Sequence, residues 1–84
     1  MKNFSVRDIL NKFRWHPDYE FSKVVIVYID RPRGLSELSG AEIEKVGHSF
    51  VYLKSGAAIP MHRIVEVRYG EEVVWRRPSS ARST

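Results

Sequence analysis

Residues 23–30 read KVVIVYID, and this stretch decides the fold. Its β-branched residues follow one another without a break, and no polar side chain interrupts either face before Tyr28. Such a run is typical of a strand that lies inside a sheet and is covered on both faces. We therefore predict an interior strand over residues 23–31, with the side chains of Val25 and Val27 buried.

The segment before this strand has the pattern of an amphipathic helix. Ser5 and Asp8 have the spacing of a capping box. Apolar residues then recur at the spacing of one helix face, at Val6, Ile9, Leu10 and Phe13. Because Pro17 disfavours helical angles at the residue before it, we predict a helix over residues 6–14.

The segment after the strand is interrupted at Pro32 and Gly34, and a short strand is expected next at residues 35–38. Ser39 and Glu42 then repeat the capping-box spacing. This repeat predicts one or two further helical turns.

From residue 49 onward, apolar and polar residues alternate between two tight turns, Ser55-Gly56 and Gly70-Glu71. The pattern predicts a meander of consecutive antiparallel strands. Strict alternation over residues 64–69 places Val65, Val67 and Tyr69 on one face and Ile64, Glu66 and Arg68 on the other.

Together these segments predict an α+β fold, in which an N-terminal helix packs on a curved, mainly antiparallel sheet of about five strands, with a small barrel as the alternative. The second helical segment is short. We expect one domain over residues 1–78 and a disordered polar tail over residues 79–84. Trp15 and Trp75 are expected to anchor the core or its rim, because so small a domain needs their buried area.

The composition excludes several classes of site. The chain has 84 residues and no Cys, so neither a disulfide nor a thiolate metal site can form. His16, His48 and His62 lack the short spacing of zinc ligands, and the chain has no glycine-rich phosphate loop and no nucleophile elbow. We therefore expect no metal and no cofactor. No stretch approaches the ~20 apolar residues of a membrane span, so we expect a soluble, cytoplasmic protein without membrane contact.

The charge favours an anionic partner without requiring one. The net charge is +4, and residues 48–84 hold six Lys and Arg against three Asp and Glu. This excess is compatible with nucleic acid as a partner. A solubilising surface with a basic tail would give the same balance.

His62 and Arg63 follow Pro60 at the head of the last hairpin and form the first candidate site. A guanidinium binds phosphate oxygens in bidentate fashion, and an imidazole adds a second donor. Adjacent strand residues point to opposite faces, so both reach one anion only if Pro60 brings a bulge. The alternatives are a structural, half-buried His62 and an Arg63 paired with Glu66.

Tyr28, Arg31 and Arg33 form a second candidate cluster, where the buried strand ends and the chain turns. Strand ends that open into loops are common places for binding groups. The alternative is an ordinary solvated strand end.

Taken in order, five segments resemble the RNA cyclic group end recognition domain family, small and mostly archaeal proteins formerly called a domain of unknown function. The segments are VRDILNKFRWHP, VVIVYIDR, EIEKVGHSFVYLKSG, IPMHRIVEVRYG and VVWRR, between Val6 and Arg77. The resemblance implies a non-catalytic module that binds RNA ends bearing a 2′,3′-cyclic phosphate, with RNA-processing enzymes as further partners. It also implies that His62 and Arg63 bind the RNA end. The family usually has a His-Arg pair after the Tyr-Ile of the buried strand; Arg31 matches the Arg of that pair, whereas Asp30 stands where the family usually has His.

Three functions therefore stay open. The first is an RNA-end-binding module that holds RNA ends or single strands. The second is a small RNA phosphodiesterase or nuclease with His62 as general acid or base and Arg31 or Arg63 stabilising negative charge. The third is a protein-interaction domain that docks a larger enzyme through a sheet edge or the basic tail.

Overall fold

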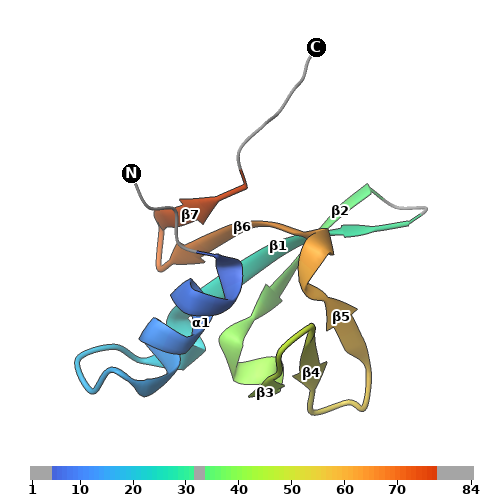
Figure 1. The fold of residues 1–84 in the computed structure, drawn as a ribbon. Helices are drawn as coiled ribbons and strands as arrows, with labels where there is room; N and C mark the ends of the chain where they lie inside the picture. The colour runs from blue at the N-terminus through green and yellow to red at the C-terminus, as the bar shows by residue number, and fades with distance from the viewer. Residues whose placement is uncertain (1–4, 32–33, 78–84) are drawn as a thin grey trace.

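The computed structural model describes residues 5–31 and 34–77, and the tail expected at residues 79–84 lies outside this range. One helix and two antiparallel sheets make up the fold (Figure 1). The elements are α1 (Val6–Trp15), β1 (Val24–Asp30), β2 (Gly34–Ser39), β3 (Ile43–Val46), β4 (Phe50–Leu53), β5 (Ala58–Pro60), β6 (Ile64–Tyr69) and β7 (Glu72–Arg76). Three short 3₁₀ turns join them: η1 (Phe21–Lys23), η2 (Gly40–Glu42) and η3 (Met61–Arg63).

The strands form two sheets rather than the single sheet that we predicted. The larger has the order β2-β1-β6-β7 and the smaller the order β3-β4-β5, and the described strands do not close into a barrel. The interior position of β1 is confirmed, as are the predicted α+β class and the β4–β5 and β6–β7 hairpins. The meander is wrong at one point, because η3 separates β5 from β6 and places them in different sheets.

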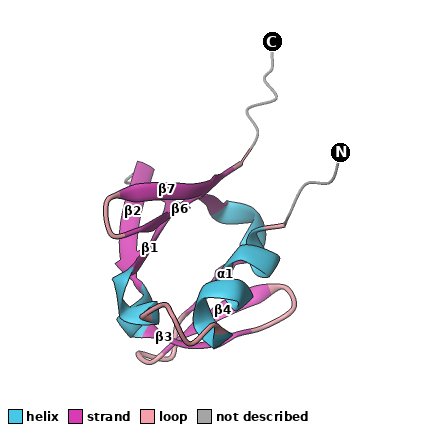
Figure 2. Cartoon of the chain, turned by 90° about the vertical axis from the view of Figure 1, so that its left-hand side faces the viewer, coloured by secondary structure: helices cyan, strands magenta, loops and turns pink. Residues whose placement is uncertain are grey.

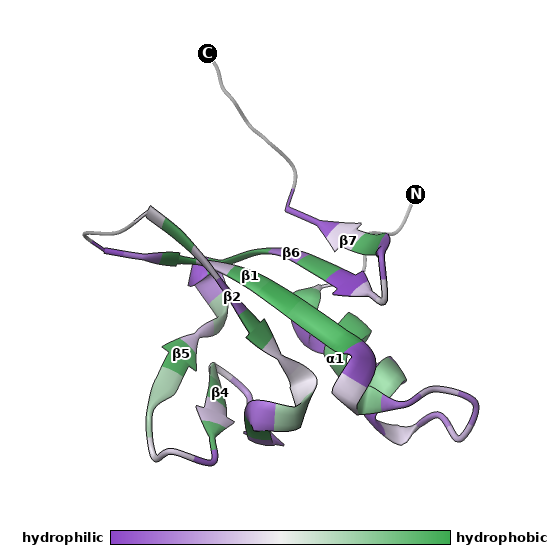
Figure 3. Ribbon diagram, turned by 180° about the vertical axis from the view of Figure 1, so that it is seen from behind, coloured by the Kyte–Doolittle hydropathy of each residue, from purple (hydrophilic) through white to green (hydrophobic). Residues whose placement is uncertain are grey.

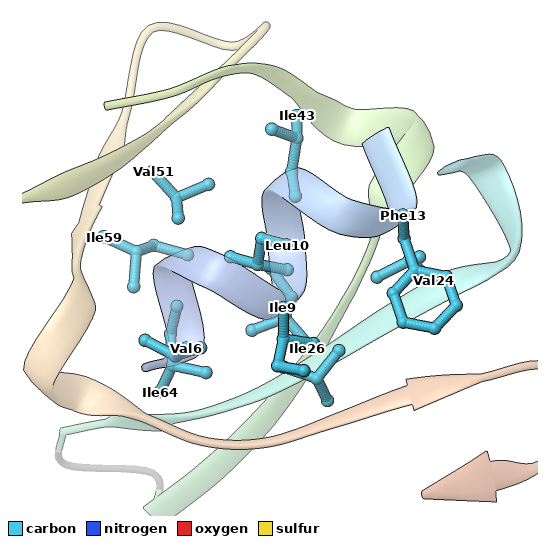
Figure 4. Close-up of a cluster of buried hydrophobic side chains, with 11 residues drawn as sticks. Val6, Ile9, Leu10, Phe13, Val24, Ile26, Ile43, Val51, Ile59 and Ile64 are labelled. Carbon is cyan, nitrogen blue, oxygen red and sulfur yellow. The ribbon is translucent and has the colours of Figure 1, made fainter. Parts of the chain in front are cut away.

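The helix α1 begins as predicted and packs against strands of both sheets, at one side of the opening between them (Figure 2). The Ser5 hydroxyl accepts from the Asp8 amide at 3.1 Å, and the Asp8 carboxylate accepts from the Ser5 amide at 3.2 Å. Leu10 lies at the centre of the core, with Val51 and Ile59 from the smaller sheet on one side and Ile26 and Ile64 from the larger sheet on the other (Figure 4). The helix therefore supplies the apolar layer that joins the sheets.

A bulge at Val65 explains why strict alternation is wrong along β6. Val27 pairs with Glu66, but the next residue of β1, Tyr28, pairs with Ile64, so Val65 is an extra residue. The shift turns both Ile64 and Val67 toward the core, and both are fully buried.

The second face of β1 is covered by charged side chains instead of an apolar layer. Figure 3 shows β1 as a largely hydrophobic strand. Val27 is buried as predicted and stands in register between Glu37 and Glu66, whereas Val25 is half-buried. Across this face, Arg68 donates to Glu66 at 2.6 Å and to Glu37 at 3.1 Å, and Arg76 donates to Glu66 at 3.2 Å.

The second helical segment is a single 3₁₀ turn, within the one or two turns predicted, and it leads into a strand that we did not predict. The Ser39 hydroxyl caps η2 by accepting from the Ala41 amide, but the chain extends into β3 from residue 43. A Cβ on Gly40 would lie 1.9 Å from the Phe21 carbonyl oxygen, so the close contact between η1 and η2 needs glycine.

Trp15 contradicts the prediction that both tryptophans anchor the core. Its side chain is 73% exposed at the end of α1, whereas Trp75 is half-buried and packs against the core. In the described part of the chain, no helix is long and apolar enough to cross a membrane.

We expect Leu10→Ala to lower the free energy of unfolding by about 2–5 kcal/mol, because Leu10 is fully buried between the sheets. Leu10→Met, which conserves volume, should cost less than about 1.5 kcal/mol. Urea denaturation measures both. Equal losses for the two variants would show that the site does not depend on filled volume.

We also expect Glu66→Gln to flatten the acid side of the stability profile. The Arg68 hydrogen bond, together with Arg76, lowers the pKa of the Glu66 carboxyl below its usual 4.5. A lowered pKa in the folded state stabilises the fold above the unfolded pKa, and this contribution is lost as pH falls through the folded value. The melting temperatures of wild type and Glu66→Gln should therefore differ at pH 7 and converge below about pH 4.5. A constant difference across that range would contradict the assignment.

Candidate functional site

His62 and Arg63 lie on η3, the turn that carries the chain from the smaller sheet to the larger. Pro60 precedes the turn with a φ of −61°, and the Met61 amide donates to the Ser49 carbonyl at 2.9 Å. Both side chains are exposed. The structure places both residues on a 3₁₀ turn, and not beside a bulge in a strand as we expected, so the rule that strand neighbours point to opposite faces does not apply to them.

Arg63 and Tyr28 line the same hollow, which has a volume of about 210 Å³. It lies where the end of β1 faces β5, because Tyr28 pairs with Ile64 immediately after η3. Its other walls include Asp30, Leu53, Ile59 and Pro60. His62 is beside Arg63 in the chain but does not line the hollow.

The remaining candidate residues follow β1 in the sequence. Arg31 is exposed directly after β1, and Arg33 lies outside the described residues. The Asp30 carboxylate lines the hollow and accepts a hydrogen bond from the Ser36 hydroxyl at 3.0 Å. An acidic residue therefore lines the same hollow as Arg63.

The charged groups of this site are available to a ligand. Among residues 5–31 and 34–77, no hydrogen bond or ion pair engages the side chains of His62, Arg63 or Arg31. The alternative that Arg63 pairs with Glu66 is wrong, because the Glu66 carboxylate forms its ion pairs with Arg68 and Arg76. Within the same ranges, no group of three His, Cys, Asp or Glu side chains could hold a metal ion.

Arg77 is a residue of this site that sequence reasoning missed. Its Nε donates to the Ile64 carbonyl at 3.0 Å and its Nη2 to the Met61 carbonyl at 3.0 Å, so one guanidinium bridges the two ends of η3. The guanidinium also lies 5.3 Å from the centre of the Trp75 ring. Arg77 thus holds the turn that presents His62 and Arg63.

A second hollow, of about 390 Å³, lies between α1 and the strands β6 and β7. Its aromatic wall is a packed cluster, in which the ring centres of Phe13 and Tyr69 are 5.1 Å apart. Its charged residues, Lys12 and Glu72, have opposite signs. It contains none of the predicted site residues and offers no concentrated positive charge.

We expect Arg77→Met to loosen η3, because the thioether keeps part of the apolar stem but cannot donate to either carbonyl. The free energy of unfolding should fall by about 1.5–3 kcal/mol, the usual loss for hydrogen bonds from a charged group. Hydrogen exchange at the amides of residues 62–64 should quicken.

Arg76→Met is the matched control, because the Arg76 side chain contacts Glu66 on the outer face and not η3. In this control variant, the rate of hydrogen exchange at the amides of residues 62–64 should equal that of wild type. Unchanged exchange in Arg77→Met would show that the turn is held by the rest of the fold.

Comparisons with known proteins agree with the resemblance seen in the sequence. A family model described as the MJ1316 RNA cyclic group end recognition domain matches residues 1–77. A UPF0248 protein of Archaeoglobus fulgidus is 71% identical over 69 residues, which cover 82% of this chain and 100% of that protein. A UPF0248 protein of Metallosphaera sedula is 37% identical over 79 residues, covering 93% of this chain and 99% of that protein. No solved structure gives a significant match. The chain therefore belongs to the MJ1316 RNA cyclic group end recognition domain family.

Proposed function

We propose that this protein binds RNA ends that carry a 2′,3′-cyclic phosphate, and that the phosphate lies in the hollow beside η3. The observation that carries the proposal is the placement of Arg63 and Tyr28 on one hollow, next to the exposed His62. The family description names the same kind of ligand.

The donors around the hollow suit a cyclic phosphodiester. Such a group carries one negative charge on two free oxygens, which a guanidinium can bind in bidentate fashion. The Tyr28 hydroxyl supplies a further donor, and the exposed side chains of His62 and Arg31, which do not line the hollow, contact the adjoining RNA outside it. The volume of about 210 Å³ is below the range of about 300–1,000 Å³ usual for whole small molecules. The hollow therefore suits the terminal group of an RNA rather than a complete nucleotide.

Asp30 gives the site a means of distinguishing phosphates by their charge. A linear phosphomonoester carries about −1.5 to −2 charges at pH 7, whereas the cyclic form carries one. The Asp30 carboxylate repels both, but it repels the dianion more strongly. A carboxylate at this position thus favours the cyclic end over its hydrolysed product.

The same geometry supports binding over turnover as the main activity. His62 is exposed on η3, outside the hollow that holds Arg63 and Tyr28. General acid–base cleavage needs a proton-transfer group within hydrogen-bond reach of the reacting oxygens. Incubation of the protein with a cyclic-phosphate RNA, followed by analysis of the ends, separates the two activities, and accumulation of a monophosphate end would establish the phosphodiesterase instead.

We expect Arg63→Ala to weaken binding of a short RNA with a cyclic-phosphate end by about tenfold or more, because a charge-assisted bond contributes about 1.5–3 kcal/mol. His62→Ala should act in the same direction, and the same RNA with a free 3′-hydroxyl should bind almost unchanged. Fluorescence anisotropy measures these affinities, and Lys23→Ala is the control for an exposed cation at the opposite end of β1.

Asp30→Asn provides the complementary test, because the amide oxygen still accepts from Ser36 while the charge is gone. This variant should bind both phosphate ends more tightly and should gain more for the monophosphate end. If Arg63→Ala lowered the affinity for both RNAs equally and Asp30→Asn raised neither affinity, the RNA would bind elsewhere on the protein.

A further inference from the structure

The outer face of the smaller sheet presents two exposed aromatic rings beside η3. Phe50 is 39% exposed and Tyr52 is 41% exposed, whereas Val51 between them is fully buried against the core. Alternation along β4 therefore places both rings on the face away from α1. Their centres are 6.2 Å apart, so they form a pair on the central strand.

On the β5 side, small residues stand opposite both rings. Ala58 pairs with Tyr52 and Pro60 pairs with Phe50 on β5. On the other side, a Cβ on Gly47 would lie 2.7 Å from Cε2 of Tyr52, so the ring rests against the glycine backbone. No large side chain stands opposite either ring on β5, and glycine allows the close approach on the other side.

A lysine stands beside the rings. A bulge at Glu44 in β3 makes that residue the extra one, so Lys45 stands opposite Tyr52. At the other end, Phe50 is in register with Pro60, the residue that precedes η3 with His62 and Arg63. Leu53 and Ile59 line the hollow from the inner face of the same sheet, so an RNA that reaches both the hollow and the rings passes over the edge strand β5.

We infer that Phe50 and Tyr52 form a stacking platform for the unpaired bases that precede the cyclic-phosphate end. The inference rests on the proposed function, and it specifies the substrate as an RNA with a single-stranded 3′ end. Aromatic side chains stack on splayed-out bases without strong sequence preference, and lysine beside them binds the backbone. A hollow that holds only the terminal group leaves the bases to be bound outside it.

The register also sets a direction along the RNA. Phe50 is nearer to η3 than Tyr52, because its partner Pro60 adjoins the turn while Ala58 does not. With the cyclic phosphate in the hollow, the last base stacks on Phe50 and the preceding base on Tyr52. In a paired end the bases stay stacked within the duplex, so the platform cannot engage them.

The test uses the full chain and fluorescently labelled five-nucleotide RNAs that end in a cyclic phosphate or a 3′-hydroxyl. Phe50→Leu and Tyr52→Leu keep an apolar side chain but remove the aromatic face, and thermal melting verifies their folding. Tyr52→Phe keeps the face. Val73→Ala on β7 is the control, because Val73 is 41% exposed, equal to Tyr52, but belongs to the other sheet.

We expect each Leu variant to bind the single-stranded RNAs about tenfold more weakly, with the ratio between the two ends unchanged. Tyr52→Phe and Val73→Ala should bind as wild type does. An abasic sugar at the last position should weaken wild-type binding to the same extent and have no further effect in Phe50→Leu. An RNA whose 3′ end is paired should bind weakly, and the Leu variants should not change its affinity.

Unchanged single-strand affinity in both Leu variants would overturn the inference and leave this face to a protein partner. If both Leu variants bound normally but Arg63→Ala abolished the discrimination between the two RNA ends, the proposed cyclic-phosphate site would still be supported without the stacking platform. Conversely, loss of affinity in the Leu variants without any discrimination between ends would support the platform and refute the cyclic-phosphate site.

Discussion

The packing of one short helix between two small sheets is the constraint on which the structure depends. The buried residues of both sheets belong to one cluster with those of α1, and the smaller sheet has only three strands. Leu10 contributes to both sides of the joint, because residues of both sheets surround it. Without an apolar helix face at this place, the two sheets would present their inner faces to water, and hydrophobic burial is the main favourable term in folding.

The same division into two sheets creates the corner where the candidate site lies. A continuous meander would have joined β5 and β6 by a ladder of hydrogen bonds, with the intervening residues in a tight turn. Instead, η3 changes the chain direction, and Arg77 satisfies carbonyls at both of its ends. The side chains of His62 and Arg63 thus project from a turn that is anchored to β6 and β7, although they are themselves exposed. A rigid support beneath exposed binding groups reduces the entropy lost when a ligand orders them.

Much of the fold could be predicted from local patterns, and the exceptions have physical causes. The capping box of α1 and the apolar run of β1 are signals within a few residues, and both predictions are confirmed. The bulge at Val65 and the separation of β5 from β6 are set by packing against α1, which no local pattern reports. Trp15 has the side chain of a typical core residue, but it lies two residues after Phe13, the last buried residue of α1, and so is off the buried face of the helix.

The candidate site shows the same limit. His62 and Arg63 were accessible to sequence reasoning because their chemistry suits an anion and because the segment resembles a known family. Arg77 was not, since the carbonyls that it binds belong to residues 13 and 16 positions earlier in the chain. Any of the arginines in the last third could have held that place, and only the register of the β6–β7 hairpin selects this one.

The short edge strand β5 has a consequence for the behaviour of the protein in a crowded cell. A free sheet edge is a template on which another chain can add a strand. At this edge the strand has only three residues and ends in Pro60, which has no amide to donate. An incoming strand would therefore find few hydrogen-bonding groups beside the aromatic face, so this exposed apolar surface lies next to an edge that resists strand addition.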